Sequence, residues 1–233
     1  MKVHRPIKLR VEEFESRLLP SAGIPWPSLS SNWSGYSVDA AAGAVTDVKG
    51  SWTVPSVTVS SGGNKYAATW LGIDGDNSKT VEQIGTDSDQ NNGTPVYYAW
   101  YEMYPSNYFY INWATKTGIP ASSNVPAAAL VGAGDTITAD VQFLSSSGNI
   151  STFQLTITDT PAGGGLTRTF STVQTIKNAA RSSAEWIVEQ TGTLSDFSPT
   201  TFTNAQATIQ TTSGTVTGTI GTFLHGDSST VVY

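Results

Sequence analysis

The stretch SSAEWIVEQ, residues 182–190, contains two glutamates in a chain that is otherwise poor in charge. In an extended strand, alternate side chains point to opposite faces, so Glu185, Ile187 and Glu189 share one face. A carboxylate can take a proton from water, and the resulting carboxylic acid can return it to a leaving group. The spacing alone does not rank the two glutamates, and carboxylates on strands are more often solvated than catalytic.

The stretch PVYYAWYEMYP, residues 95–105, is more aromatic than an ordinary surface strand. In extended form, one of its faces presents Tyr98, Trp100, Glu102 and Tyr104, and the other presents Tyr97, Ala99, Tyr101 and Met103. Flat rings with polar tips beside a carboxylate suit a groove that binds an extended polymer. The alternative is burial of both faces inside a sandwich, with Glu102 at the rim.

A third polar stretch, WLGIDGDNSKTVEQIGTD, spans residues 70–87. Strand geometry places Gln83 on the opposite face from Glu82, and composition does not distinguish Gln83 from a solvated strand glutamine. Asp74 and Asp76 flank a glycine, but the spacing does not continue as a calcium-binding EF-hand loop. Aspartates in such turns commonly cap backbone N–H groups, so we predict no metal ligands here.

Several enzyme classes lack their residues in this chain. It has no cysteine, and His4 and His225 are its two histidines, which makes thiolate or histidine metal sites improbable. The motifs of serine hydrolases, zincins and P-loop enzymes are absent, and a Ser-His-Asp triad could use only His225. We therefore predict neither a metal nor a cofactor.

The elements that must position these residues are short strands. The chain has 22 glycines and 11 prolines but only 13% charged residues, and the stretch TFQLTIT, residues 152–158, alternates apolar with polar side chains. Turn signals such as DGDN, NNGT and PAGGG separate such runs. The pattern predicts an all-β fold, an antiparallel sandwich or barrel of jelly-roll type. No apolar run is long enough to span a membrane.

The chain divides at about residue 23. Residues 1–23 hold five of the 12 basic residues, which leaves residues 24–233 with seven basic and 15 acidic residues. This acidic balance argues against a nucleic-acid partner.

Charged residues in 1–23 interrupt any apolar signal-peptide core, yet its segment LRVEEFESRLLPSA resembles a short motif ahead of secreted or surface proteins in some bacteria. We expect 1–23 to be a targeting or pro segment that is disordered or removed, 24–233 to be one domain, and the protein to be secreted or on the cell surface. The alternative for 1–23 is a frayed amphipathic helix.

Six blocks in order, SNWSGY, GSWTVP, WLGIDG, VEQIGTD, AWYEMYP and SSAEWIVE, resemble the glutamic peptidases, also called eqolisins or Gln/Glu acid endopeptidases. They extend from about residue 31 to about residue 190. The resemblance implies a sandwich of two bent antiparallel sheets, similar to legume lectins. It also implies an endopeptidase that works in acid on a polypeptide substrate, which we expect to be a monomer.

The resemblance carries a catalytic pair onto Gln83 and Glu185, and makes Glu189 a neighbour. The cleft residues that it implies are Trp33, Trp70, Asp74, Asp87, Trp100, Glu102 and Tyr104. The chain departs from better-known members at Thr86, at Met103 and after Val188, and it lacks the disulfides of fungal-type members. These departures bear on subsite preference and stability and leave the proposed pair in place.

Two other functions fit the residues without the resemblance. A jelly-roll glycoside hydrolase would use Glu102 and Glu185 as two carboxyl groups about 5 to 10 Å apart, and would not need Gln83. A non-catalytic carbohydrate-binding module would keep the aromatic groove and would not depend on Glu185.

Overall fold

The computed structural model describes residues 30–76, 78–122, 124–219 and 229–232. The predicted N-terminal segment, residues 1–23, and His225 lie outside the described residues. The described part is built from strands joined by turns, with one short 3-10 helix at Ala127–Ala129. No helix in the described ranges combines the length and the apolar character needed to cross a membrane. The all-β prediction is confirmed.

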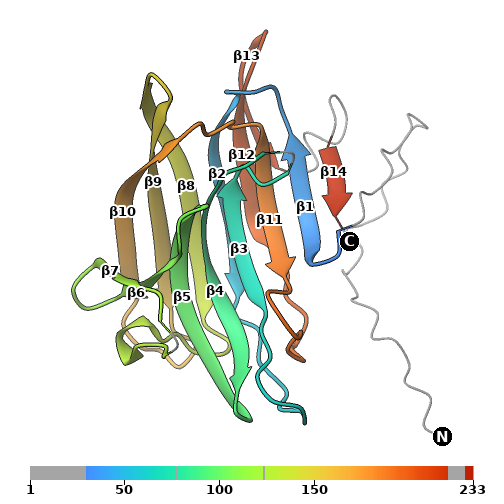
Figure 1. Cartoon of the computed structure of the whole chain (residues 1–233), viewed down its shortest axis with the longest axis vertical. Coiled ribbons are helices and arrows are strands. Elements are labelled where there is room, and N and C mark those ends of the chain that lie inside the picture. Colours follow the sequence, from blue (N-terminus) through green and yellow to red (C-terminus); the bar gives the residue numbers. More distant parts are fainter. Residues whose placement is uncertain (1–29, 77, 123, 220–228, 233) are drawn as a thin grey trace, which may run out of the picture.

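Two antiparallel sheets form two layers (Figure 1). The eight-stranded sheet has the order β14-β1-β11-β3-β4-β5-β6-β7. Its strands are β1 (Trp33–Asp39), β3 (Ala68–Ile73), β4 (Val81–Asn91), β5 (Thr94–Tyr104), β6 (Phe109–Asn112), β7 (Thr117–Pro120), β11 (Ser183–Glu189) and β14 (Ser229–Val232). The six-stranded sheet, in the order β10-β9-β8-β2-β12-β13, contains β2 (Val45–Thr53), β8 (Thr136–Ser147), β9 (Ile150–Thr160), β10 (Arg168–Lys177), β12 (Thr203–Thr211) and β13 (Gly214–Thr219). The prediction of a β-sandwich is confirmed.

The main core lies between the two sheets. In the eight-stranded sheet, Trp186, Leu71, Ile84 and Tyr101 are register partners on neighbouring strands, and all four belong to this core. Phe153, Leu155 and Ile157 of β9 contribute every second residue from the other sheet. The period of two read from TFQLTIT is the alternation that buries this face.

Thr86 and Met103, two of the positions at which the chain departs from the pattern that it resembles, belong to this core layer. Trp52 donates its indole N–H to the Thr86 hydroxyl at 3.0 Å, and Met103 is buried in the main core. Since a buried indole N–H needs an acceptor, a threonine at position 86 supplies one that an aliphatic residue would not. Neither residue faces the aromatic groove, so both substitutions act on packing.

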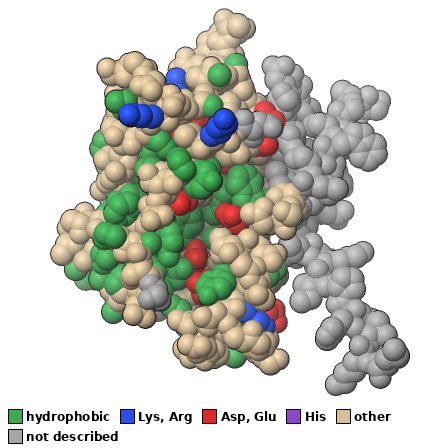
Figure 2. Space-filling view, viewed as in Figure 1, with side chains coloured by type: hydrophobic (Ala, Val, Ile, Leu, Met, Phe, Trp, Pro, Cys, Tyr) green, Lys and Arg blue, Asp and Glu red, His purple; other side chains and the backbone are tan. Residues whose placement is uncertain are grey.

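The opposite face of the eight-stranded sheet is also covered. A second apolar cluster lies there, formed by Trp70, Ile187, Trp100, Tyr110 and four smaller or flanking side chains. Figure 2 shows a hollow in the middle of the molecule, lined by hydrophobic side chains with acidic groups among them. As a result β3 and β4 are buried on both faces along most of their length.

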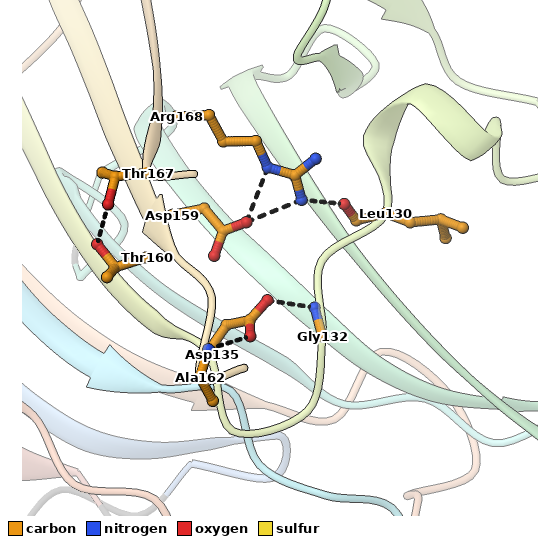
Figure 3. Close-up of polar contacts among 8 residues, drawn as sticks. All are labelled: Leu130, Gly132, Asp135, Asp159, Thr160, Ala162, Thr167 and Arg168. Carbon is orange, nitrogen blue, oxygen red and sulfur yellow. Dashed lines mark hydrogen bonds and ion pairs between the residues drawn. The ribbon is translucent and has the colours of Figure 1, made fainter. Parts of the chain in front are cut away.

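A polar cluster fixes the connection that passes from β7 to β8 (Figure 3). The Arg168 guanidinium donates to the Asp159 carboxylate at 2.9 and 2.8 Å, and to the Leu130 carbonyl. It also stacks over the Trp113 ring, 4.6 Å from its centroid. Asp135 accepts the backbone N–H groups of Gly132 and Ala162. These contacts join the edge of the six-stranded sheet to the loop that leaves the other sheet.

Candidate active site

The register of the eight-stranded sheet places three candidate side chains in one row. Glu185 of β11 pairs with Gly72 of β3, Gly72 pairs with Gln83 of β4, and Gln83 pairs with Glu102 of β5. Directly paired residues point to the same face, so the three side chains lie on the side opposite the main core. Neighbouring strands are about 4.8 Å apart, which puts the Glu185 and Gln83 backbones roughly 10 Å from each other.

Gly72 stands between the two proposed catalytic residues. A Cβ atom at this position would lie 2.8 Å from the Glu82 carbonyl oxygen and 3.1 Å from the Gln83 Cβ. The strand therefore packs too closely against β4 to accept a larger residue without a shift. With no side chain at Gly72, no Cβ atom stands between the Glu185 and Gln83 side chains in this row.

The Glu185 side chain is fully buried, and one of its two carboxylate oxygens is hydrogen-bonded within the described residues. Its Oε1 accepts the backbone N–H of Asp76 at 2.6 Å and the Ser183 hydroxyl at 2.8 Å, whereas Oε2 has no hydrogen-bond partner among the described residues. Burial raises the pKa of the Glu185 carboxyl well above its usual range, and the two donors act in the opposite direction. Glu185 Oε2 is therefore a buried oxygen that can accept a hydrogen bond from a bound molecule.

A glycine turn covers this carboxylate. A Cβ atom at Gly75 would lie 2.6 Å from Glu185 Oε2 and 2.8 Å from the Trp33 ring, and the residue has a φ of +124°. Both the space and the backbone conformation favour glycine at this position. Gly75 and Trp33 thus close the site over Glu185.

The structure places Asp74 behind the wall of the cleft, so its predicted role as a cleft residue is corrected. Asp74 is fully buried, and its carboxylate accepts the backbone N–H groups of Arg181 at 2.7 Å and Ser182 at 2.8 Å. Backbone capping, the general habit of aspartates in such turns, is what this residue does. It ties the turn that carries the Asp76 N–H to the start of β11, and so holds both donors to Glu185 in place.

Gln83 is held on its other side by Glu102. The Gln83 amide Nε2 donates to Glu102 Oε2 at 2.6 Å. Gln83 Oε1 is buried and has no partner among the described residues. Burial raises the pKa of the Glu102 carboxyl to about 7, Glu189 adds to this effect through its charge, and the Gln83 hydrogen bond opposes it.

Two aspartates and two aromatic residues form the next layer of the cleft. Asp87 accepts the Trp100 indole N–H at 2.6 Å and the Tyr98 hydroxyl at 2.7 Å, and the same hydroxyl lies 3.0 Å from Asp89. Burial raises the pKa of both carboxyls, that of Asp89 to about 6. The Tyr98 hydroxyl has one hydrogen and cannot donate to both carboxylates at once. Asp87 and Asp89 are therefore favoured to keep one proton between them. Asp89 was not predicted, although it follows Gln83 and Asp87 on the same strand face.

Glu189 also lies in the cleft, which its ranking as a mere neighbour of Glu185 did not anticipate. Its carboxylate accepts the Trp70 indole N–H at 3.0 Å and the Asn32 side-chain amide at 3.0 Å. Trp70 in turn packs edge-to-face against Trp33, with 5.2 Å between ring centroids. Both tryptophans are therefore beside Glu189, with Trp33 on the cleft wall and Trp70 buried beneath it.

The cleft has a volume of about 880 Å³. Of the predicted residues, those on its walls are Trp33, Gln83, Asp87, Trp100, Glu102 and Tyr104. Glu185, Trp70 and Asp74 lie beneath the surface and are fully buried. The sequence interpretation did not include Tyr66, Asp76, Lys79 and Tyr108, which also line the cleft. These come from turns and loops, where no periodic pattern marks them.

Sequence similarity relates the chain to known peptidases. The sequence profile of the peptidase A4 family matches residues 31–232. The chain belongs to the peptidase A4 family. It is 31% identical to aspergillopepsin-2 of Aspergillus niger over 219 residues, which cover 83% of this chain and 70% of that protein. The resemblance to glutamic peptidases is confirmed, and this A4 peptidase is a glutamic-type endopeptidase.

Solved structures support the fold of this A4 peptidase. Two crystal structures of scytalido-glutamic peptidase, one with a peptide-based transition state analog and one with a transition state analog inhibitor, align with TM-scores of 0.54 and 0.51. Sequence identity is 22% and 23%, and each alignment covers 80% of this chain and 83% of that one. At this sequence identity, the two structures show that the chain shares their fold.

Proposed function

We propose that this acid endopeptidase hydrolyses peptide bonds with Glu185 as general base and then general acid, and with Gln83 as the group that stabilises the oxyanion. The observation that carries the proposal is a pair of buried acceptors, Glu185 Oε2 and Gln83 Oε1, on two sides of Gly72 and without hydrogen-bond partners in the part of the chain that the structure describes. A water molecule has two hydrogens to donate. One water bound between these two oxygens would satisfy both.

The reaction follows from this arrangement. Glu185 takes a proton from the water as its oxygen attacks the scissile carbonyl carbon, and the carbonyl oxygen becomes an oxyanion. Gln83 Nε2 keeps one N–H beyond the bond to Glu102, and this N–H donates to the oxyanion. When the tetrahedral intermediate collapses, the C–N bond breaks and Glu185 returns its proton to the leaving nitrogen. The carboxylate is regenerated.

A glutamine has an advantage over a second carboxylate at this position. Two close carboxyl groups share a proton and separate their pKa values. Gln83 cannot ionise, so Glu185 titrates without a like-charged partner across the gap. The aromatic walls then supply contact area for an extended polypeptide, with Trp33, Trp100 and Tyr104 on the cleft surface.

The glycosidase alternative is disfavoured by the register as well as by the family. Glu102 and Glu185 stand three strands apart in one sheet, about 14 Å between their backbones, and Gln83 and Gly72 lie between them in the row. Glu102 is instead bonded to Gln83, which a glycosidase would not need. The carbohydrate-binding alternative does not explain a buried carboxylate with two donors.

An assay on a denatured protein substrate tests the proposed activity. The purified protein is expected to cleave the substrate into peptides at acidic pH and to continue in the presence of a pepstatin-type inhibitor, because such inhibitors act on two catalytic aspartates and the pair proposed here is Glu185 and Gln83. Fragments are identified by mass spectrometry. Complete inhibition by the pepstatin-type compound, or no cleavage across the acidic range, would contradict the proposal.

The donors to Glu185 give a pH-dependent prediction. In Ser183→Ala the carboxylate loses one donor, its pKa rises further, and the base form appears only at higher pH. The acid limb of kcat/KM against pH is expected to move upward by about one pH unit, given about 1.5 kcal/mol for a hydrogen bond to a charged group. A limb that stays in place, or moves to lower pH, would show that Glu185 is not the titrating base.

Export, the removal of residues 1–23 and a monomeric state stay predictions. The segment LRVEEFESRLLPSA supports the first two by its resemblance to an N-terminal motif of exported proteins.

A further inference from the structure

The Gln83 amide is hydrogen-bonded to Glu102. The two residues are register partners on β4 and β5, and the hydrogen bond from Gln83 Nε2 to Glu102 Oε2 is 2.6 Å long. No other side-chain hydrogen bond joins Gln83 to the described residues, since its Oε1 is without a partner. A glutamine amide can turn end for end at little cost unless a neighbour distinguishes its oxygen from its nitrogen. Glu102 supplies that distinction.

The charges around Glu102 favour its neutral form. Three acidic residues from three elements line the same cleft, namely Asp76 of the turn before β4, Asp87 of β4 and Glu189 of β11, and of these Glu189 acts on Glu102 through its charge. Lys79, from that same turn, is the basic residue among the described residues of the cleft wall. The remaining titratable side chains that line the cleft are Tyr66, Tyr98, Tyr104 and Tyr108. Burial is the main cause of the raised pKa of Glu102, about 7, and Glu189 adds to it.

The charge state of Glu102 matters because of what Gln83 does under the proposed function, on which this inference rests. A carboxylate accepting from Gln83 would put a full negative charge beside the group that binds the oxyanion. Two like charges about 5 Å apart, at an effective dielectric constant of about 20, slow a reaction by roughly 10²-fold, and solvent at this half-buried site reduces the effect to about tenfold. A neutral carboxylic acid with its proton on Oε1 still presents Oε2, the oxygen that accepts from Gln83 Nε2, as an acceptor without this repulsion, and so still distinguishes the amide nitrogen from the amide oxygen.

We propose that Glu102 is a positioning residue that works as a neutral carboxylic acid, holding the Gln83 amide with its nitrogen toward the oxyanion and its oxygen toward the attacking water. Loss of its proton slows hydrolysis. Glu102 therefore sets the basic limb of the pH profile, while Glu185 sets the acid limb.

The test is the pH dependence of kcat/KM for the parent and for Glu102→Gln. A glutamine at 102 keeps a carbonyl acceptor for Gln83 and cannot ionise. The parent is expected to lose about tenfold in kcat/KM as the pH rises through 7, and the basic limb of Glu102→Gln is expected to lie at least one pH unit higher. In Glu102→Leu the acceptor is gone, and kcat is expected to fall about tenfold or more at every pH, with KM changed less than threefold.

Two results would overturn the inference. One is a Glu102→Gln basic limb at the parent's pH. The other is loss of the parent's circular dichroism signal over the same pH range, because the limb would then report unfolding. Failure of the proposed function is a separate result: it would appear as a Glu185→Gln protein that remains active in acid.

Discussion

Gln83→Ala is expected to lower kcat by about 10² to 10³-fold at acidic pH, which is the usual loss when one oxyanion donor is removed. KM should change little, because the lost N–H donates to an oxygen that carries full charge only in the transition state. The measurement is steady-state hydrolysis of one defined peptide by the parent and the variant. The alanine also removes Oε1, one of the two proposed acceptors for the attacking water.

A matched control for this substitution is Gln154→Ala. Gln154 lies on β9 in the other sheet, where its amide bonds to the Ser171 hydroxyl, far from the cleft in the sheet order. Its replacement is expected to leave kcat and KM as they are. Equal activity of Gln83→Ala and the parent would remove Gln83 from the mechanism and would revive a site built on carboxylates alone.

Glu185→Gln is expected to lower kcat by about 10⁴-fold, the upper end of the effect of a general acid–base group, because this residue acts in both proton transfers. A glutamine is nearly isosteric, and its carbonyl oxygen can still accept from the Asp76 N–H and the Ser183 hydroxyl. The variant should therefore fold. The measurement is single-turnover hydrolysis with enzyme in excess.

Thermal unfolding separates loss of chemistry from loss of structure in this variant. The fold raises the pKa of Glu185, so the folded state holds its proton to higher pH than the unfolded chain. The stability that this proton binding contributes is full below the usual carboxyl pKa and is lost as the pH rises through the folded value. The glutamine amide of the variant does not ionise, so the variant does not lose stability in this way. The Tm of Glu185→Gln at pH 7 should therefore be no lower than that of the parent. A lower Tm would mean that the inactivity has a structural cause.

The layers of the fold could be predicted from the sequence, because alternation of apolar and polar side chains fixes the face that packs. TFQLTIT of β9 is an example, since Phe153, Leu155 and Ile157 all enter the main core. The face carrying Glu185, Ile187 and Glu189 could not be predicted in the same way. Its burial depends on Trp33 and Gly75, which lie more than 100 positions away in the chain.

The alternation of apolar and polar residues also does not predict which residues become neighbours across the sheet. The row formed by Glu185, Gly72 and Gln83 depends on strand order and register, which bring β11 next to β3 and β3 next to β4. The family resemblance supplied the pairing of Glu185 with Gln83, and it carried Asp74 along as a cleft residue. The contacts of Asp74 with the backbone of Arg181 and Ser182 show a supporting position instead.

The hydrolysis rate of one defined peptide at acidic pH, measured side by side for the parent, Glu185→Gln and Glu189→Gln, tests the central claim most directly. The two glutamates share one strand face and both bear on the cleft, but only Glu185 stands in the row with Gly72 and Gln83. Glu185→Gln is expected to lose about 10⁴-fold in rate, and Glu189→Gln to stay within about tenfold of the parent. A Glu185→Gln protein that cleaves the peptide at the parent's rate, or a Glu189→Gln protein with the larger loss, would contradict the assignment of Glu185 as the catalytic carboxyl group.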